Sequence, residues 1–131
     1  MNHQSHTTQG VAILALNGRF DAYQTTDVKA WLEQATAAPP ARLVVNLAGV
    51  DFIDSTALAT LVQGMKRARQ HEGDLVLCAL RQPVRMVFEL TRLDKAFAIY
   101  PDEPAAIAGV LAASETIQER KEDAQSRKAN D

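Results

Sequence analysis

The sequence has few residues suited to cross-linking or membrane insertion. Cys78 is the only cysteine among 131 residues, which excludes an intramolecular disulfide and a cysteine-rich zinc site. No apolar run reaches the roughly 18 residues that a membrane-spanning helix needs. Residues 1–9 are polar and lack the apolar region of a signal peptide. We therefore expect a soluble, cytoplasmic protein without membrane insertion.

Aromatic residues are also scarce, at 5%, whereas hydrophobic residues as a whole make up 47%. A chain of this length is the size of one domain, so aliphatic side chains must fill a single core. Neither sign of charge dominates, because 14 Lys and Arg residues are balanced by 16 Asp and Glu residues. This balance argues against direct binding of nucleic acid through a strongly basic surface.

The common signatures of catalysis are missing as well. The sequence has no phosphate-binding glycine loop, no G-x-G-x-x-G turn and no G-x-S-x-G elbow. His71 lies about 16 residues beyond Ser55, which is roughly 24 Å along a helix, so these two side chains cannot form a local catalytic pair. We expect no enzyme activity and no cofactor.

Short apolar runs alternate with amphipathic helical patterns along the chain. Such alternation predicts an α/β fold with a mainly parallel sheet covered by helices. The first run, Val11–Leu16, is expected to end at a turn formed by Asn17-Gly18. Residues 1–10 are expected to form a flexible segment or an antiparallel edge strand, residues 11–117 the folded domain, and residues 118–131 a charged tail. Further strands are predicted at 42–47, 75–80 and 96–100, and helices between Thr25 and Pro39, from Ser55 for about four turns, from Pro83 and after Asp102.

The segment from Gly49 to Thr56 is the candidate functional loop, because sites in parallel sheets lie beyond the carboxyl ends of strands. Ser55 has two interpretations there. Its hydroxyl can cap the following helix, or it can accept a phosphate, which the helix N-terminus would stabilise. Asp51 and Asp54 could bind Mg²⁺, but paired loop carboxylates more often bond the local backbone, and we expect no metal.

The segment V-N-L-A-G-V-D-F-I-D-S-T-A-L-A-T-L, residues 45–61, resembles the signature of STAS domains. More narrowly, it is similar to bacterial anti-sigma factor antagonists. The resemblance continues at residues 17–21, 72–77 and 84–93, and covers roughly residues 11–111. It implies a small, mainly parallel sheet with helices packed on one face.

The resemblance also implies a function. Antagonists of this family bind an anti-sigma factor that is a serine kinase of the histidine-kinase-like ATPase type. The kinase phosphorylates the serine after the motif's aspartate and then dissociates, and a PP2C-type phosphatase restores the antagonist. That serine is Ser55 here, with Thr56 as the second choice. Ala57 stands where the family usually has glycine, so we expect either a tighter approach for the kinase or a stiffer loop.

The expected contact surface with the kinase combines the candidate loop with its surroundings. A phosphate there would have to be desolvated on binding, so it would release the partner. Alternative functions are a constitutive STAS scaffold, including a transporter-associated subunit, and a small-ligand-binding α/β module. The predicted partner-binding residues are Asp21, Tyr23, Gln24, Asp51, Asp54, Thr56, Thr60, Gln63 and Arg67, with the last three expected to be exposed on the helix.

Overall fold

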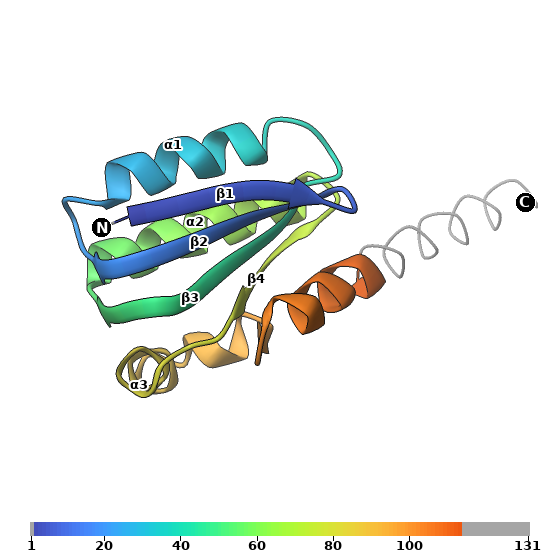
Figure 1. Ribbon diagram of the computed structural model, residues 1–131. Coiled ribbons are helices and arrows are strands. Elements are labelled where there is room, and N and C mark those ends of the chain that lie inside the picture. Colours follow the sequence, from blue (N-terminus) through green and yellow to red (C-terminus); the bar gives the residue numbers. More distant parts are fainter. Residues whose placement is uncertain (1, 114–131) are drawn as a thin grey trace, which may run out of the picture.

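A computed structural model describes residues 2–113 of the chain (Figure 1). The expected charged tail, residues 118–131, lies outside the described residues, as does the end of the expected domain. The strands are β1 (Asn2–Thr8), β2 (Val11–Phe20), β3 (Arg42–Ile53), β4 (Asp74–Cys78) and β5 (Ile99–Tyr100). The helices are α1 (Thr25–Ala35), α2 (Ser55–Gln70), α3 (Gln82–Leu90), the 3-10 turn η1 (Leu93–Lys95), and a helical segment over residues 103–113.

The five strands form one sheet in the order β1-β2-β3-β4-β5. Only β1 runs antiparallel, and it pairs with β2 from Thr8↔Val11 to Asn2↔Asn17. The other three pairings are parallel. The α/β class, the mainly parallel sheet and the antiparallel edge strand expected from the sequence are therefore confirmed. Within the described residues, no helix is long and apolar enough to cross a membrane.

Alternating side chains give the sheet two apolar faces, as the period-two geometry of strands requires. One face carries Leu14 and Leu43 and packs against α1, α2 and α3, so the arrangement of helices on one face holds for these three. Val44, on the other face, belongs to a second cluster that includes Ala106 and Val110. The helical segment 103–113, orange in Figure 1, therefore covers part of the opposite face.

Two strands are longer than their apolar runs predicted. The turn expected at Asn17-Gly18 is wrong, because β2 continues to Phe20 with irregular pairing on both sides of these residues. Gly18 has a φ of 99°, which glycine adopts readily because it has no Cβ. The extension pairs in parallel with β3, which runs on to Ile53. The segment 49–53, expected to be a loop, is therefore strand, and only Asp54 separates it from α2.

Candidate functional site

Ser55 is the first residue of α2, and its side chain is exposed. The capping role considered for its hydroxyl belongs to Asp54 instead. Asp54 has an extended backbone, and its Oδ1 accepts a hydrogen bond of 2.9 Å from the Ala57 N–H. This is the geometry of an N-cap aspartate. Ser55 makes no side-chain hydrogen bond within residues 2–113, so its hydroxyl is left available to solvent.

The second oxygen of Asp54 joins α2 to the turn that follows β2. Oδ2 accepts a 2.9 Å hydrogen bond from the Ala22 N–H, and the Asp54 N–H donates to the Phe20 carbonyl at 3.2 Å. The carboxylate of Asp54, directly before Ser55, thus links the β2–α1 turn to the first turn of α2. Asp54, expected to contact a partner, is half-buried and positions both segments.

The β2–α1 turn is closed by its own hydrogen bonds. Asp21 Oδ1 accepts from the Tyr23 N–H at 3.1 Å, and the Asp21 carbonyl accepts from the Gln24 N–H at 3.0 Å. Tyr23 is 90% exposed, which is the most for any large hydrophobic residue described. The following helix, α1, begins after Gln24 without a side-chain cap, and the Thr25 hydroxyl donates to the Ala22 carbonyl.

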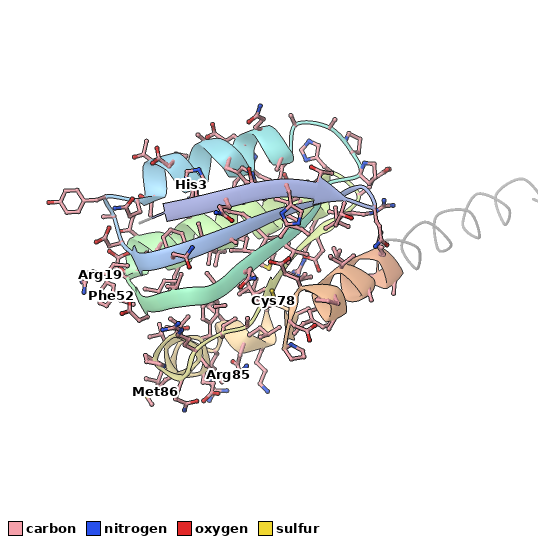
Figure 2. The ribbon with its side chains drawn as sticks, viewed as in Figure 1. His3, Arg19, Phe52, Cys78, Arg85 and Met86 are labelled. Atoms are coloured by element: carbon pink, nitrogen blue, oxygen red, sulfur yellow. The ribbon has the colours of Figure 1, made fainter. Side chains whose placement is uncertain are left out.

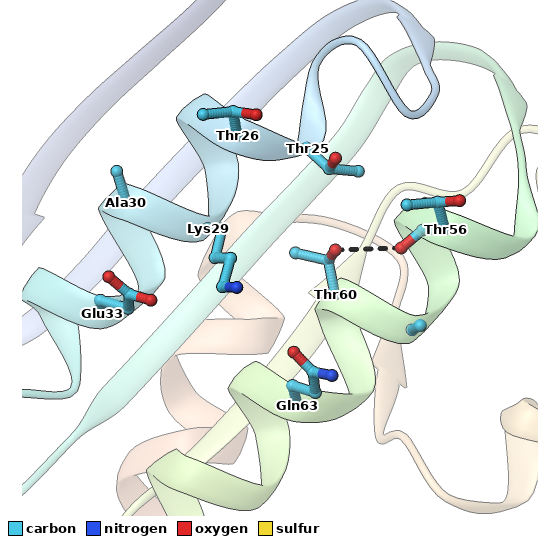
Figure 3. A pocket seen from close by; sticks show the side chains of 9 residues that line it. Thr25, Thr26, Lys29, Ala30, Glu33, Thr56, Thr60 and Gln63 are labelled. Atoms are coloured by element: carbon cyan, nitrogen blue, oxygen red, sulfur yellow. Dashed lines mark hydrogen bonds between the residues drawn. The ribbon is translucent and has the colours of Figure 1, made fainter.

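A polar groove of about 610 Å³ runs between α1 and α2, next to Ser55. Figure 3 shows Thr56, Thr60 and Gln63 on the α2 wall and Lys29 directed into the groove from α1. The expectation that Thr60 is exposed is wrong. It is only 7% exposed, because α1 packs across it, and its hydroxyl donates to the Thr56 carbonyl at 2.9 Å.

Two other predicted contact residues are exposed as expected. Gln63 lies in the groove, and Arg67 lies one turn further along α2. An Arg67 Nη1 to Glu33 Oε1 distance of 3.8 Å defines an ion pair between α2 and α1. Both partners are half-exposed, so this pair contributes little to stability. Arg67 therefore remains accessible near the far end of the groove.

Asp51 is exposed near the end of β3, beside an aromatic residue that sequence reasoning missed. Phe52 is 37% exposed, and the Arg19 guanidinium carbon lies 3.9 Å from its ring centroid (Figure 2). If β2 and β3 had been predicted to extend to Phe20 and Ile53, Arg19 and Phe52 would have been placed opposite each other on neighbouring strands. Asp54 uses both oxygens on backbone N–H groups, and the described residues hold no cluster of three or more metal-ligating side chains.

Cys78 is a buried cysteine whose thiol is unreactive in the folded protein. It is buried in β4, and burial raises the pKa of its thiol to about 12, with Glu103 and Asp102 adding to the effect. Glu103 in turn accepts a 2.6 Å hydrogen bond from Asn46 Nδ2. The thiol therefore stays protonated and acts as a small apolar side chain in the core.

The STAS domain family model matches residues 2–106, so the chain belongs to the STAS family. Among curated relatives, a Bordetella bronchiseptica protein provisionally named anti-sigma factor antagonist BtrV is 31% identical over 99 residues, covering 76% of this chain and 85% of the relative. An anti-sigma F factor antagonist of Paenibacillus polymyxa is 26% identical over 100 residues, covering 76% and 86%.

Solved structures share the fold. A protein of Thermotoga maritima, described as an anti-sigma factor antagonist on a provisional basis, has a TM-score of 0.77 at 24% identity and covers 82% of this chain and 93% of its own. The Bacillus protein SpoIIAA in its phosphorylated form has a TM-score of 0.66 at 20% identity, covering 83% and 99%. At these identities the likeness concerns the fold alone.

Proposed function

We propose that this protein is an anti-sigma factor antagonist whose binding to an anti-sigma factor is regulated by phosphorylation of Ser55. One observation carries the proposal: an exposed serine hydroxyl begins α2, directly after an aspartate that caps the helix and holds the neighbouring turn. The antagonist names of the relatives support the same role. The proposed partner is a serine kinase of the histidine-kinase-like ATPase type, with a PP2C-type phosphatase that reverses the modification.

The position of Ser55 lets a phosphate change the surface while the fold is retained. Within residues 2–113 Ser55 has no side-chain bond to lose, and the free N–H groups of the first helical turn favour a nearby anion. A phosphate adds about −1.5 to −2 charge, against a formal net charge of −2 for the whole chain. Asp54 lies next to it, so the local negative charge would be concentrated at the mouth of the α1–α2 groove.

That concentrated charge explains release of the partner. The proposed interface contains Ser55 itself, so the phosphate must lose its hydration when the kinase binds, and any acidic group opposite would repel it. A penalty of about 1.4 to 3 kcal/mol would weaken binding by about ten- to a hundredfold. The proposed contacts around it come from the β2–α1 turn, the end of β3 and the exposed side of α2: Asp21, Tyr23, Gln24, Asp51, Thr56, Gln63 and Arg67, with Thr60 at the groove wall.

Thr56 is the second candidate acceptor, because it is exposed and lines the groove. Ala57 distinguishes the site from the usual family motif. Its side chain is fully buried and its N–H is bound by Asp54, so it fixes the first turn of α2. We expect a kinase that acts on this chain to accept a rigid Ser55. Partnership with a sigma-factor regulator would place the protein in the cytoplasm.

The proposal is tested by capture of partners with the native chain, followed by incubation with ATP. We expect a bound protein with a histidine-kinase-like ATPase domain, and phosphate on Ser55 by mass spectrometry. Ser55→Ala should retain that partner and Ser55→Asp should release it. Ser5→Asp, an equal charge change on exposed β1, is the matched control and should bind normally. Equal binding by all variants, without phosphate on Ser55 or Thr56, would leave only the constitutive scaffold function.

A further inference from the structure

A second exposed surface lies on α3, away from the groove between α1 and α2. Val84 and Phe88 anchor this helix in the core, and the Phe88 ring makes an edge contact with Phe97 at 5.7 Å between centroids. The opposite side of the same helix is also apolar. Met86 is 49% exposed and Leu90 is 78% exposed. An ordinary amphipathic helix would carry polar side chains on this outward side.

These apolar side chains form a ridge. Pro83, Met86 and Leu90 are spaced i, i+3 and i+7, so they lie in line on the solvent side of α3. Because the inner side of α3 is fixed by buried contacts, the ridge is held rigidly. Exposed apolar side chains gathered on one face, with methionine among them, are typical of protein-binding sites.

Basic residues lie on α3 and just beyond its two ends. Residues 81–95 contain four Lys or Arg side chains and two acidic ones, in a chain whose formal net charge is −2. Arg81 is fixed at the start of α3, where its Nε donates to the Ala48 carbonyl of β3 at 2.6 Å. Arg92 and Lys95 are exposed beyond the other end of the helix, and Arg85 lies on α3 beside Met86 (Figure 2). The segment that carries the apolar ridge therefore has an excess of positive charge, with Glu89 as the acidic residue on α3 itself.

We propose that this α3 surface, defined by Pro83, Met86, Leu90 and the basic residues Arg81, Arg85, Arg92 and Lys95, docks an acidic amphipathic helix of a partner protein. Such a helix would lay its apolar side chains along the ridge and place its carboxylates against the arginines. The inference does not depend on the Ser55 switch, because the two surfaces share no residue.

Two other occupants fit the surface less well. A second copy of this chain would bring the same excess of positive charge, and one face of a nine-residue helix offers far less than the roughly 800 Å² per partner of a stable interface. An anionic membrane would meet exposed Glu89 on the flank of the ridge. A folded partner can instead place a cation opposite Glu89.

The test uses fluorescence anisotropy with a labelled synthetic helix about four turns long, with leucine on one face and glutamate on the other. We expect saturable binding to the native chain, at least tenfold weaker binding to Met86→Gln/Leu90→Gln, and weaker binding to Arg85→Gln. The control variant Lys66→Gln, which removes a positive charge from an exposed residue of α2, should bind normally. Circular dichroism melting curves establish that each variant is folded.

Several results would overturn the proposal. Equal binding of a scrambled peptide, or of a version with lysine in place of glutamate, would show that the surface does not select an acidic amphipathic helix. Sedimentation of the native chain with phosphatidylserine vesicles, in the absence of peptide binding, would assign the surface to a membrane. A native dimer that the Met86→Gln/Leu90→Gln variant loses would assign it to a second copy.

Discussion

Replacement of Asp54 by alanine should destabilise the fold through two separate hydrogen bonds. Loss of the N-cap to Ala57 costs about 1 kcal/mol. Loss of the bond from the Ala22 N–H to the other oxygen removes a charged acceptor, which contributes about 1.5 kcal/mol at the low end for such bonds. Because this second bond is exposed to solvent, we expect a total near 2 kcal/mol, equivalent to a fall in Tm of about 7 °C.

Urea denaturation followed by circular dichroism measures this change. Asp54→Asn retains one carbonyl oxygen and is a good N-cap, so it should lose about half as much as Asp54→Ala. Asp51→Ala, an exposed aspartate three residues earlier, is the control and should change stability by less than about 0.5 kcal/mol. Amide exchange at Ala22 and Ala57 should quicken only in the Asp54 variants.

A loss of less than about 0.5 kcal/mol in Asp54→Ala, or a loss no larger than that of Asp51→Ala, would contradict this role of Asp54. Either result would mean that water replaces both carboxylate bonds, and that the β2–α1 turn is held by other contacts. The position of Ser55 would then owe nothing to Asp54.

Three further predictions concern the core and the turns around it. Leu61→Asp places a charge in the fully buried contact of α2 with the sheet and should abolish the cooperative melting transition; a native transition would show that this helix face is assigned wrongly. Gly73→Ala would place a Cβ against the Ala41 carbonyl, so we expect a loss of about 1 to 3 kcal/mol in urea, and an unchanged midpoint would contradict this. The Cys78 thiol should react with a thiol reagent at pH 8 only in denaturant. Since its folded pKa lies near 12 against an ordinary 9.0, the free energy of unfolding should decrease as pH rises from 9 towards 12, and a Cys78→Ala variant should lack this decrease.

The alternation of apolar runs was enough to predict the fold class, because each buried strand is a local signal. The lengths of β2 and β3 were not predictable in the same way. Asn17 and Gly18 favour a turn locally, but here their strand pairs with residues 49–53 of a distant segment. Gly49 permits that pairing, because a Cβ there would collide with Asn17 and with the Leu16 carbonyl. A local sequence pattern cannot show that two distant segments pair in this way.

In the candidate site, too, local features were predictable from the sequence, whereas features that depend on distant segments were not. The sequence located the start of α2 correctly, but Asp54 and Ser55 are both good capping residues at adjacent positions, and only the backbone leaving β3 decides between them. Thr60 was expected to be exposed because it lies off the apolar stripe of α2. Its burial depends on how closely α1 approaches, and that approach follows from packing between two helices.

In the proposed function, one phosphate on Ser55 controls binding to an anti-sigma factor. Isothermal titration calorimetry of the captured kinase with unmodified chain and with chain carrying phosphoserine at position 55 tests it most directly. We expect affinity at least tenfold weaker for the phosphorylated chain, with an unchanged melting temperature for the protein itself. Equal affinities for the two forms would contradict it.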